Sequence, residues 1–110
     1  MATTTYKVLG QVATAATTET DLYTVPAATQ AVISTIVVAN RAFATATFRV
    51  SVSVAGAATA DKDYLYYDVL INENTTAAFT LGITLGATDK IRVYASNANL
   101  SFSVFGSELA

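Results

Sequence analysis

The feature that most constrains the fold is an alternation of apolar and polar residues that recurs along the chain. In the segment 47–54, Phe48 and Val50 alternate with polar neighbours, and the segments 91–96 and 100–104 repeat this pattern. A period of two places successive side chains on opposite faces of a β-strand, so that one face contacts a core. No segment shows the helical period, and the sequence therefore predicts an all-β protein.

Eight β-strands are predicted, separated by short segments rich in turn-forming residues. Their predicted ranges are 5–12, 21–25, 30–39, 45–55, 63–71, 75–81, 89–96 and 99–105. The segment 82–88, in which Gly82 and Gly86 flank a short apolar run, is predicted to be irregular chain tucked under the sheet. Short, regularly spaced strands predict an antiparallel β-sandwich of about eight strands. Jelly-roll and immunoglobulin-like topologies both fit, and the sequence does not choose between them.

The length of 110 residues predicts a single domain spanning residues 1–110. The chain has no cysteine, so its stability must come from the sheet core, from contacts between subunits, or from both. The segment from Met1 to Thr5 is polar, and we expect it to form a flexible arm that reaches a neighbouring subunit.

Charge and hydropathy exclude several classes of partner. Only 13% of the residues are charged, the net charge is −2, and the six basic residues are dispersed along the chain. Binding to a nucleic-acid backbone needs clustered basic residues, so no nucleic-acid partner is expected. No stretch approaches the roughly 20 apolar residues of a membrane helix, so no membrane partner is expected. The first residues do not resemble a signal peptide, which predicts synthesis and retention in a cytoplasm.

Residues that usually carry catalysis are scarce. The chain has no histidine, and Glu19 and Asp21 are two carboxylates on one short segment, which is a poor arrangement for bracketing a glycosidic bond. Asp61 and Asp63 have the spacing of a calcium loop, but Lys62 lies between them and too few other oxygen ligands follow. The sequence predicts a solvated loop there, and no catalytic, cofactor or metal site.

A group of tyrosines in the fifth predicted strand is a candidate for contact with a partner. By alternation, Tyr64 and Tyr66 share one face, and Tyr67 points to the other face with Leu65 and Val69, toward the core. Tyrosine is enriched at interfaces, so we expect Tyr64 and Tyr66 to form a protein contact. Two alternatives remain open: the rings cover the end of the sheet, or they stack on a glycan.

Three arginines and a further tyrosine complete the candidate interface. Arg41 ends a buried strand, while Arg49, Arg92 and Tyr94 lie on strands of clear alternation. An exposed arginine on a sheet often pairs with an acid across an interface. The alternative is a local ion pair with Asp68 or Glu19, and both interpretations stay open.

Six segments with a distinctive order of aromatic and aliphatic residues cover most of the chain. They are 6–11 (YKVLGQ), 22–27 (LYTVPA), 37–41 (VVANR), 64–68 (YLYYD), 91–96 (IRVYAS) and 100–108 (LSFSVFGSE). Together they resemble small virion structural proteins of tailed bacteriophages, including phages of cyanobacteria and marine bacteria.

That resemblance implies a non-enzymatic virion component made in a bacterial cytoplasm. The first expectation is a capsid decoration (cement) protein, a homotrimer that stabilises the head by binding the major capsid protein. The alternatives are a small tail, baseplate or fibre-associated protein, and a glycan-binding β-sandwich. The resemblance carries no catalytic residue.

Overall fold

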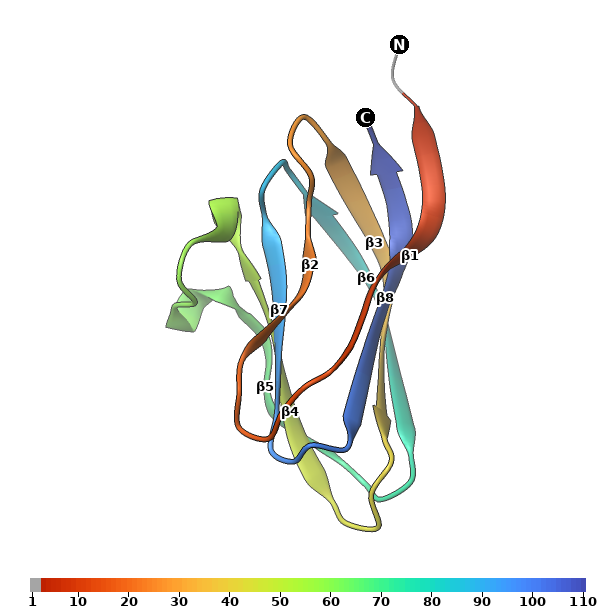
Figure 1. Cartoon of the computed structure of the whole chain (residues 1–110), viewed down its shortest axis with the longest axis vertical. Helices are drawn as coiled ribbons and strands as arrows, with labels where there is room; N and C mark the ends of the chain where they lie inside the picture. The colour runs from red at the N-terminus through yellow and green to blue at the C-terminus, as the bar shows by residue number, and fades with distance from the viewer. Residues whose placement is uncertain (1–2) are drawn as a thin grey trace.

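Two four-stranded antiparallel sheets face each other in the computed structural model, which describes residues 3–110 (Figure 1). One sheet has the order β1-β8-β3-β6 and the other has the order β2-β7-β4-β5. The strands are β1 (Thr4–Ala13), β2 (Thr20–Thr24), β3 (Gln30–Asn40), β4 (Ala46–Ser53), β5 (Tyr64–Ile71), β6 (Thr76–Leu85), β7 (Lys90–Ala95) and β8 (Leu100–Leu109). Two single turns of 3₁₀ helix, η1 (Val54–Gly56) and η2 (Asp61–Asp63), lie between β4 and β5.

The strand order decides the topology that the sequence left open. Only the connection from β4 to β5 stays within one sheet, and every other connection between β1 and β8 crosses from one sheet to the other. Eight strands in two sheets, wound in this way, form a jelly roll. The predicted eight-stranded antiparallel sandwich is confirmed.

The core lies between the sheets and consists of the inward residues of nearly every strand. Phe48 occupies its middle, with its ring centroid 5.7 Å from that of Phe79 and 6.4 Å from that of Phe102. Phe48 comes from one sheet and the other two rings come from the other, so these contacts join the layers. The largest fully buried side chains also include Ile33, Ile36, Ile91 and Leu100.

The prediction of irregular chain over 82–88 is wrong for residues 82–85, because β6 continues to Leu85, and only residues 86–88 lie outside a strand. Thr35 pairs with Thr80 and Ile33 pairs with Ile83, so one residue of β3 lies opposite two residues of β6, Leu81 and Gly82. Gly82 therefore marks a β-bulge rather than the end of a strand. Beyond the bulge Leu85 enters the core and is only 4% exposed.

Two glycines allow the close approach of neighbouring chain segments. A Cβ atom at Gly10 would overlap the carbonyl oxygen of Leu22, and one at Gly106 would overlap that of Val32. Gly10 also follows a register shift in β1, so the position combines a bulge with a close backbone approach. Gly10 thus lets β1 approach β2 of the opposite sheet, and Gly106 lets β8 approach β3 within its own sheet.

The described part of the expected N-terminal arm is paired with the other end of the chain. Thr3 exchanges two backbone hydrogen bonds with Ala110, at 2.7 and 3.0 Å, and β1 begins at Thr4. Thr3 to Thr5 therefore extend a sheet, and only Met1 and Ala2 of the predicted arm lie outside the described residues. In residues 3–110 no helix has the length and apolar character needed to cross a membrane.

Candidate interaction surfaces

The outer face of the β2-β7-β4-β5 sheet is charged and partly covered by the segment 54–63, here called the 54–63 loop. Arg92 on β7 holds this loop and also pairs with Asp21 on β2, at 3.0 Å. Lys90 pairs with the same carboxylate at 2.8 Å, and this hydrogen bond is the main reason why the pKa of Asp21 is lowered. The acceptors of the other Arg92 hydrogen bonds are Gly56 O (3.1 Å), Ala57 O (2.6 Å), Thr59 Oγ1 (3.2 Å) and Ser53 Oγ (3.0 Å).

A second group on this face surrounds Arg49 and is called the Arg49 cluster, formed by Arg49, Tyr64, Tyr67, Asp68 and Tyr94. The guanidinium lies 4.2 Å from the ring centroid of Tyr67 and 4.3 Å from that of Tyr94. Asp68 accepts two hydrogen bonds from it, at 2.7 and 3.3 Å. The Tyr64 ring meets the Tyr67 ring edge to face at 4.8 Å. The cation–π contacts hold the rings of Tyr67 and Tyr94 against a guanidinium that the Asp68 carboxylate fixes in place.

The predicted orientation of the fifth strand is wrong for two tyrosines. Tyr66 packs against the core, with its ring 4.3 Å from that of Phe79, whereas Tyr67 is 57% exposed. The reason is a bulge: Phe48 pairs with Val69 and Val50 pairs with Tyr66, so β5 has an extra residue between them. One extra residue reverses the faces of the residues beyond it, until the second register shift, between Tyr66 and Tyr64, returns Tyr64 to the outer face.

The bulge has a definite backbone signature, and Leu65 follows the same correction. Asp68 has φ +50°, in the left-handed region that Asp tolerates better than most residues. Leu65 is 46% exposed and does not enter the core, whereas Val69 packs against it as predicted. Tyr66 therefore leaves the candidate interface, and Tyr67 takes its place beside Tyr64.

Arg41 lies apart from the other candidate residues, at the end of β3. Its Nε atom donates to Ser101 Oγ at 2.9 Å, and its Nη2 atom donates to Ala98 O at 3.4 Å. The neighbouring Asn40 is buried and its side-chain amide donates to Ala44 O at 2.8 Å. These two side chains fix the loops at this end of the sandwich, so Arg41 does not join the Arg49 cluster.

Two of the acidic residues singled out in the sequence, Asp63 and Glu19, bind groups of the same chain. Asp63 is buried, accepts from the Ala60 N–H at 2.9 Å and pairs with Lys62 at 2.8 Å, and the Lys62 hydrogen bond is the main cause of its lowered pKa. Glu19 accepts from Thr59 Oγ1 at 3.1 Å. Within residues 3–110 no three acidic side chains are close enough to hold a metal ion.

The outer face of the β1-β8-β3-β6 sheet has the opposite character. In the four strands of this sheet, as far as they are described, the charged residues are Lys7 and Glu108, which pair with each other at 2.8 Å. The exposed surface instead carries Tyr6 (83% exposed), Val8 (49%) and Val32 (50%) around Phe105. We call these four residues the apolar patch.

The patch residues face the same side because of strand register. Val8 pairs with Phe105, Tyr6 pairs with Ser107, and Ser107 also pairs with Val32. Residues paired in this way project from the same face of a sheet. The patch was not predicted from the sequence, because its members come from three strands that are distant in sequence. The shortage of charged residues in those strands was the available signal.

Glu108 ties the two sheets together at one end of the molecule. It accepts from the Tyr23 hydroxyl of β2 as well as from Lys7, and its side chain is mostly buried. The Lys7 and Tyr23 hydrogen bonds, in that order, lower the pKa of Glu108. Burial and the hydrogen bond to Glu108 raise the pKa of Tyr23 above its ordinary value. This contact is structural, because Tyr23 is buried.

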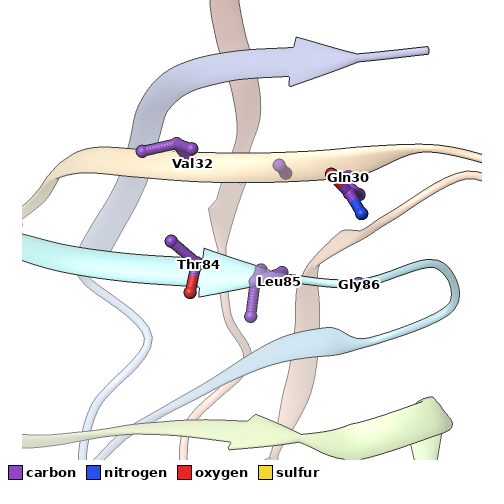
Figure 2. Close-up of a pocket in the computed structure, with 6 residues that line it drawn as sticks. Gln30, Val32, Thr84, Leu85 and Gly86 are labelled. Carbon is purple, nitrogen blue, oxygen red and sulfur yellow. The ribbon is translucent and has the colours of Figure 1, made fainter.

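A shallow hollow of about 330 Å³ lies between β3 and the end of β6. Figure 2 shows Gln30 and Val32 on β3, and Thr84, Leu85 and Gly86 on β6 and the turn after it. Its size is at the lower end for ligand pockets, but its lining contains no ionisable group. The hollow therefore has the polar side chains of Gln30 and Thr84 but none of the acid or base groups that a catalytic site uses.

Comparisons with known proteins bear on the fold. No protein-family model and no curated protein matches the sequence. A chain in a structure of infectious bursal disease virus, Gx strain, matches with a TM-score of 0.57 and 14% identity, covering 99% of this chain and 31% of that chain.

A second match comes from the crystal structure of the T13 viral particle of infectious bursal disease virus. Its TM-score is 0.57 with 10% identity, and the match covers 98% of this chain and 30% of that chain. The present chain thus spans less than a third of the length of these neighbours. At such identities the likeness shows a shared β-sandwich fold.

Proposed function

We propose that this chain is a non-enzymatic structural protein of a virus particle, and specifically a capsid decoration protein of a tailed bacteriophage. The observation that carries the proposal is the jelly-roll topology, together with the likeness of almost the whole chain to part of chains from viral particles. The resemblance of segments such as 22–27 and 100–108 to phage virion proteins supports the same role. The scarcity of catalytic residue types agrees with a role that does not require chemistry.

The apolar patch supports contact with a protein partner. An exposed apolar surface on a small domain marks an interaction site more often than scattered apolar residues do. Lys7, the charged side chain that borders the patch in the described residues, is already paired with Glu108, so a neutral shell subunit would bind without leaving a buried charge unpaired. We assign the contact with the major capsid protein to this face.

The Arg49 cluster supports a second contact. Tyr67 and Tyr64 are held rigidly, so little side-chain entropy would be lost when a partner covers them. We assign the tyrosine rings of this cluster, with Arg92 beside them, to contact between copies of this chain in a homotrimer. A decoration protein that binds only the assembled shell would stabilise that shell by mass action.

The test is to locate and count the protein in purified particles. The chain is tagged in the phage genome that encodes it, particles are separated into heads and tails, and the protein is quantified by mass spectrometry. Recovery with heads in a fixed ratio to the major capsid protein is expected. Recovery with tails would replace the proposal by the tail, baseplate or fibre alternative, and its absence from particles would refute a virion role.

A matched pair of variants tests the assigned face. Val32→Lys places a charge in the apolar patch, while Val54→Lys makes the same change at a residue of the 54–63 loop that is 68% exposed. Head binding by the purified variants should fall at least tenfold for Val32→Lys and stay unchanged for Val54→Lys. Equal binding of the two variants would remove the patch from the contact.

Glycan binding remains a second candidate because Tyr67 presents an exposed ring in a fixed position. Aromatic rings held in this way can stack on sugars. A glycan array probed with the native protein and with Tyr67→Ala distinguishes this function. Binding that is lost in the variant would support it, and an array without signal would eliminate it.

A further inference from the structure

Strand β6 is an edge of its sheet, and its segment 76–80, before the bulge at Gly82, lacks the features that protect the other edges. β2 has only five residues, β5 has two register irregularities, and β1 carries Lys7 and a bulge. Such features discourage pairing with another chain. The segment 76–80 of β6 has no charge, no proline and an unbroken register with β3.

The hydrogen-bond pattern shows which backbone groups of β6 point away from β3. The Asn40 N–H donates to Thr75 O at 2.9 Å, which makes these residues a hydrogen-bonded pair. Such pairs alternate with non-hydrogen-bonded pairs in an antiparallel ladder. The N–H and C=O groups of Thr76, Ala78 and Thr80 therefore point outward from the sheet.

The other side of β3 gives the same alternation. The Arg41 N–H donates to Asn99 O at 3.0 Å. Two residues earlier, the N–H and C=O groups of Ala39 therefore also point toward β8. β3 therefore bonds to β6 through alternate residues that include Asn40. No residue in the range 3–110 supplies a partner for the outward groups of Thr76, Ala78 and Thr80.

We propose that β6 pairs antiparallel with β6 of a second copy, about a two-fold axis at Ala78. In this register Ala78 faces Ala78 of the second copy, and Thr76 faces Thr80. Each of these three pairs can exchange two backbone hydrogen bonds, so all the outward groups of the regular segment are satisfied. A displaced register would leave at least one of the three residues unpaired.

A second copy fits this edge because antiparallel pairing of identical strands is self-complementary. The side chains beside the axis are Ala and Thr, which introduce no like-charge contact and no steric obstacle. Pairing would join two four-stranded sheets into one continuous sheet. The edge alone buries less than about 1,000 Å² in total, so the contact is weak in dilute solution and forms at high local concentration.

Cysteine crosslinking tests the proposed register, because the native chain has no cysteine. Residues that face each other lie about 5.5 Å apart between Cα atoms, within the range of a disulfide. Ala78→Cys should therefore form a disulfide-linked dimer under mild oxidation. Thr80→Cys is the matched control, since its two copies would lie about 13 Å apart along the strands.

Mixing Thr76→Cys with Thr80→Cys should give a crosslinked heterodimer, while each variant alone gives none. The failure of Ala78→Cys to crosslink at a protein concentration of about 1 mM, where weak contacts of this size are populated, would overturn the proposal. Equal crosslinking of Ala78→Cys and Thr80→Cys would also overturn it, because it would show contact without register.

Thr80→Pro tests the role of the backbone. The Thr80 N–H is not used in pairing with β3, so proline there should leave the fold intact, as measured by circular dichroism, and abolish self-association in light scattering. Thr80→Lys is the second variant if the proline disturbs folding, and it should weaken association at low salt.

The proposal concerns contact between copies and does not rest on the proposed virion role. Val32→Lys, on an interior strand of the sheet, should still allow the Ala78→Cys crosslink while losing binding to heads. A crosslink without head binding, or head binding without a crosslink, therefore separates the failure of one proposal from the failure of the other.

Discussion

The outer faces of the two sheets use their side chains in opposite ways. On the β2-β7-β4-β5 sheet, Arg49 and Arg92 bind acids, rings and backbone carbonyls of the same chain. On the β1-β8-β3-β6 sheet, the outer face carries the apolar patch, and polar contacts such as Gln11 to Ser103 are long, at 3.4 Å. The two arginines of the charged face thus stabilise the fold of their own chain.

This difference indicates which face is available to a partner. Arginines that already bind an acid within the chain have little remaining capacity for another. Covering an uncharged face with exposed valine and tyrosine is favourable, because apolar surface is removed from water. Few polar groups there have to be desolvated, so the cost of covering it is small. The comparison predicts that substitutions of the paired arginines on the charged face change stability, while those in the apolar patch change binding to the capsid subunit.

The largest effect on stability is expected in the core that lies between the two sheets. Phe48→Ala removes the ring that contacts Phe79 and Phe102 of the opposite sheet, and should lower the free energy of unfolding by about 3–5 kcal/mol. Urea denaturation measures this change. Phe43→Ala is the control, since Phe43 is 88% exposed and its loss should have little effect. Comparable losses would contradict the assigned core.

The second-largest effect on stability is expected at Arg92, whose hydrogen bonds hold the 54–63 loop. Arg92→Met removes the charged donor while keeping an apolar stem, and should cost about 2 kcal/mol, because backbone acceptors and Asp21 lose a charged partner. Limited proteolysis should then cut the 54–63 loop faster. Arg41→Met, which removes two hydrogen bonds at the end of β3, should leave that loop resistant.

A smaller effect on stability, which should depend on pH, is expected at Glu108, whose hydrogen bond to Tyr23 joins the two sheets. The pKa of Glu108 is lowered below its ordinary value of 4.5, so its ionised form stabilises the fold above about that pH. The contribution is lost as the pH falls through the lowered pKa. Glu108→Gln should therefore lower Tm at pH 7 and make little difference near pH 2.

A Tm difference for Glu108→Gln that persists unchanged at the lowest pH would show that charge is not the cause. Tyr23→Phe is the companion variant, because it removes the hydroxyl that donates to Glu108 but leaves Lys7 in place. The effects of the two substitutions should not add, since they share one hydrogen-bonded group.

The smallest effect on stability is expected on the uncharged face. Val32→Lys changes a half-exposed side chain with no described polar contact, and should alter the free energy of unfolding by less than about 0.5 kcal/mol. Thermal denaturation at the same salt concentration checks this. A loss as large as that of Arg92→Met would mean that the apolar patch serves the fold and would end the contrast between the faces.

Most of the fold followed from the local pattern of residues. Alternation such as that around Phe48 and Val50 depends only on the period of a strand, so strands and their inward residues were predicted. The errors at Tyr66, Tyr67 and Gly82 all come from bulges. A bulge depends on how many residues the neighbouring strand provides, and this information is not in the strand itself.

The candidate site was predicted only in part. Arg49, Tyr64 and Tyr94 do come together, and Arg49 pairs with Asp68, one of the two acids considered. Arg92 pairs with Asp21 rather than with Glu19, because β2 lies beside β7 in the sheet. Which strands are neighbours decides such pairs, and neighbours in this fold are distant in sequence.

By itself, the sequence determined an all-β chain with alternating strands and very few residues suited to catalysis, because period and composition are local properties. Only the tertiary structure decided the jelly-roll order, the exposure of Tyr67 instead of Tyr66, and the separation of a charged face from an uncharged one. Those outcomes depend on pairing between distant strands, and a single unpaired residue in one strand reverses which side chains the core receives.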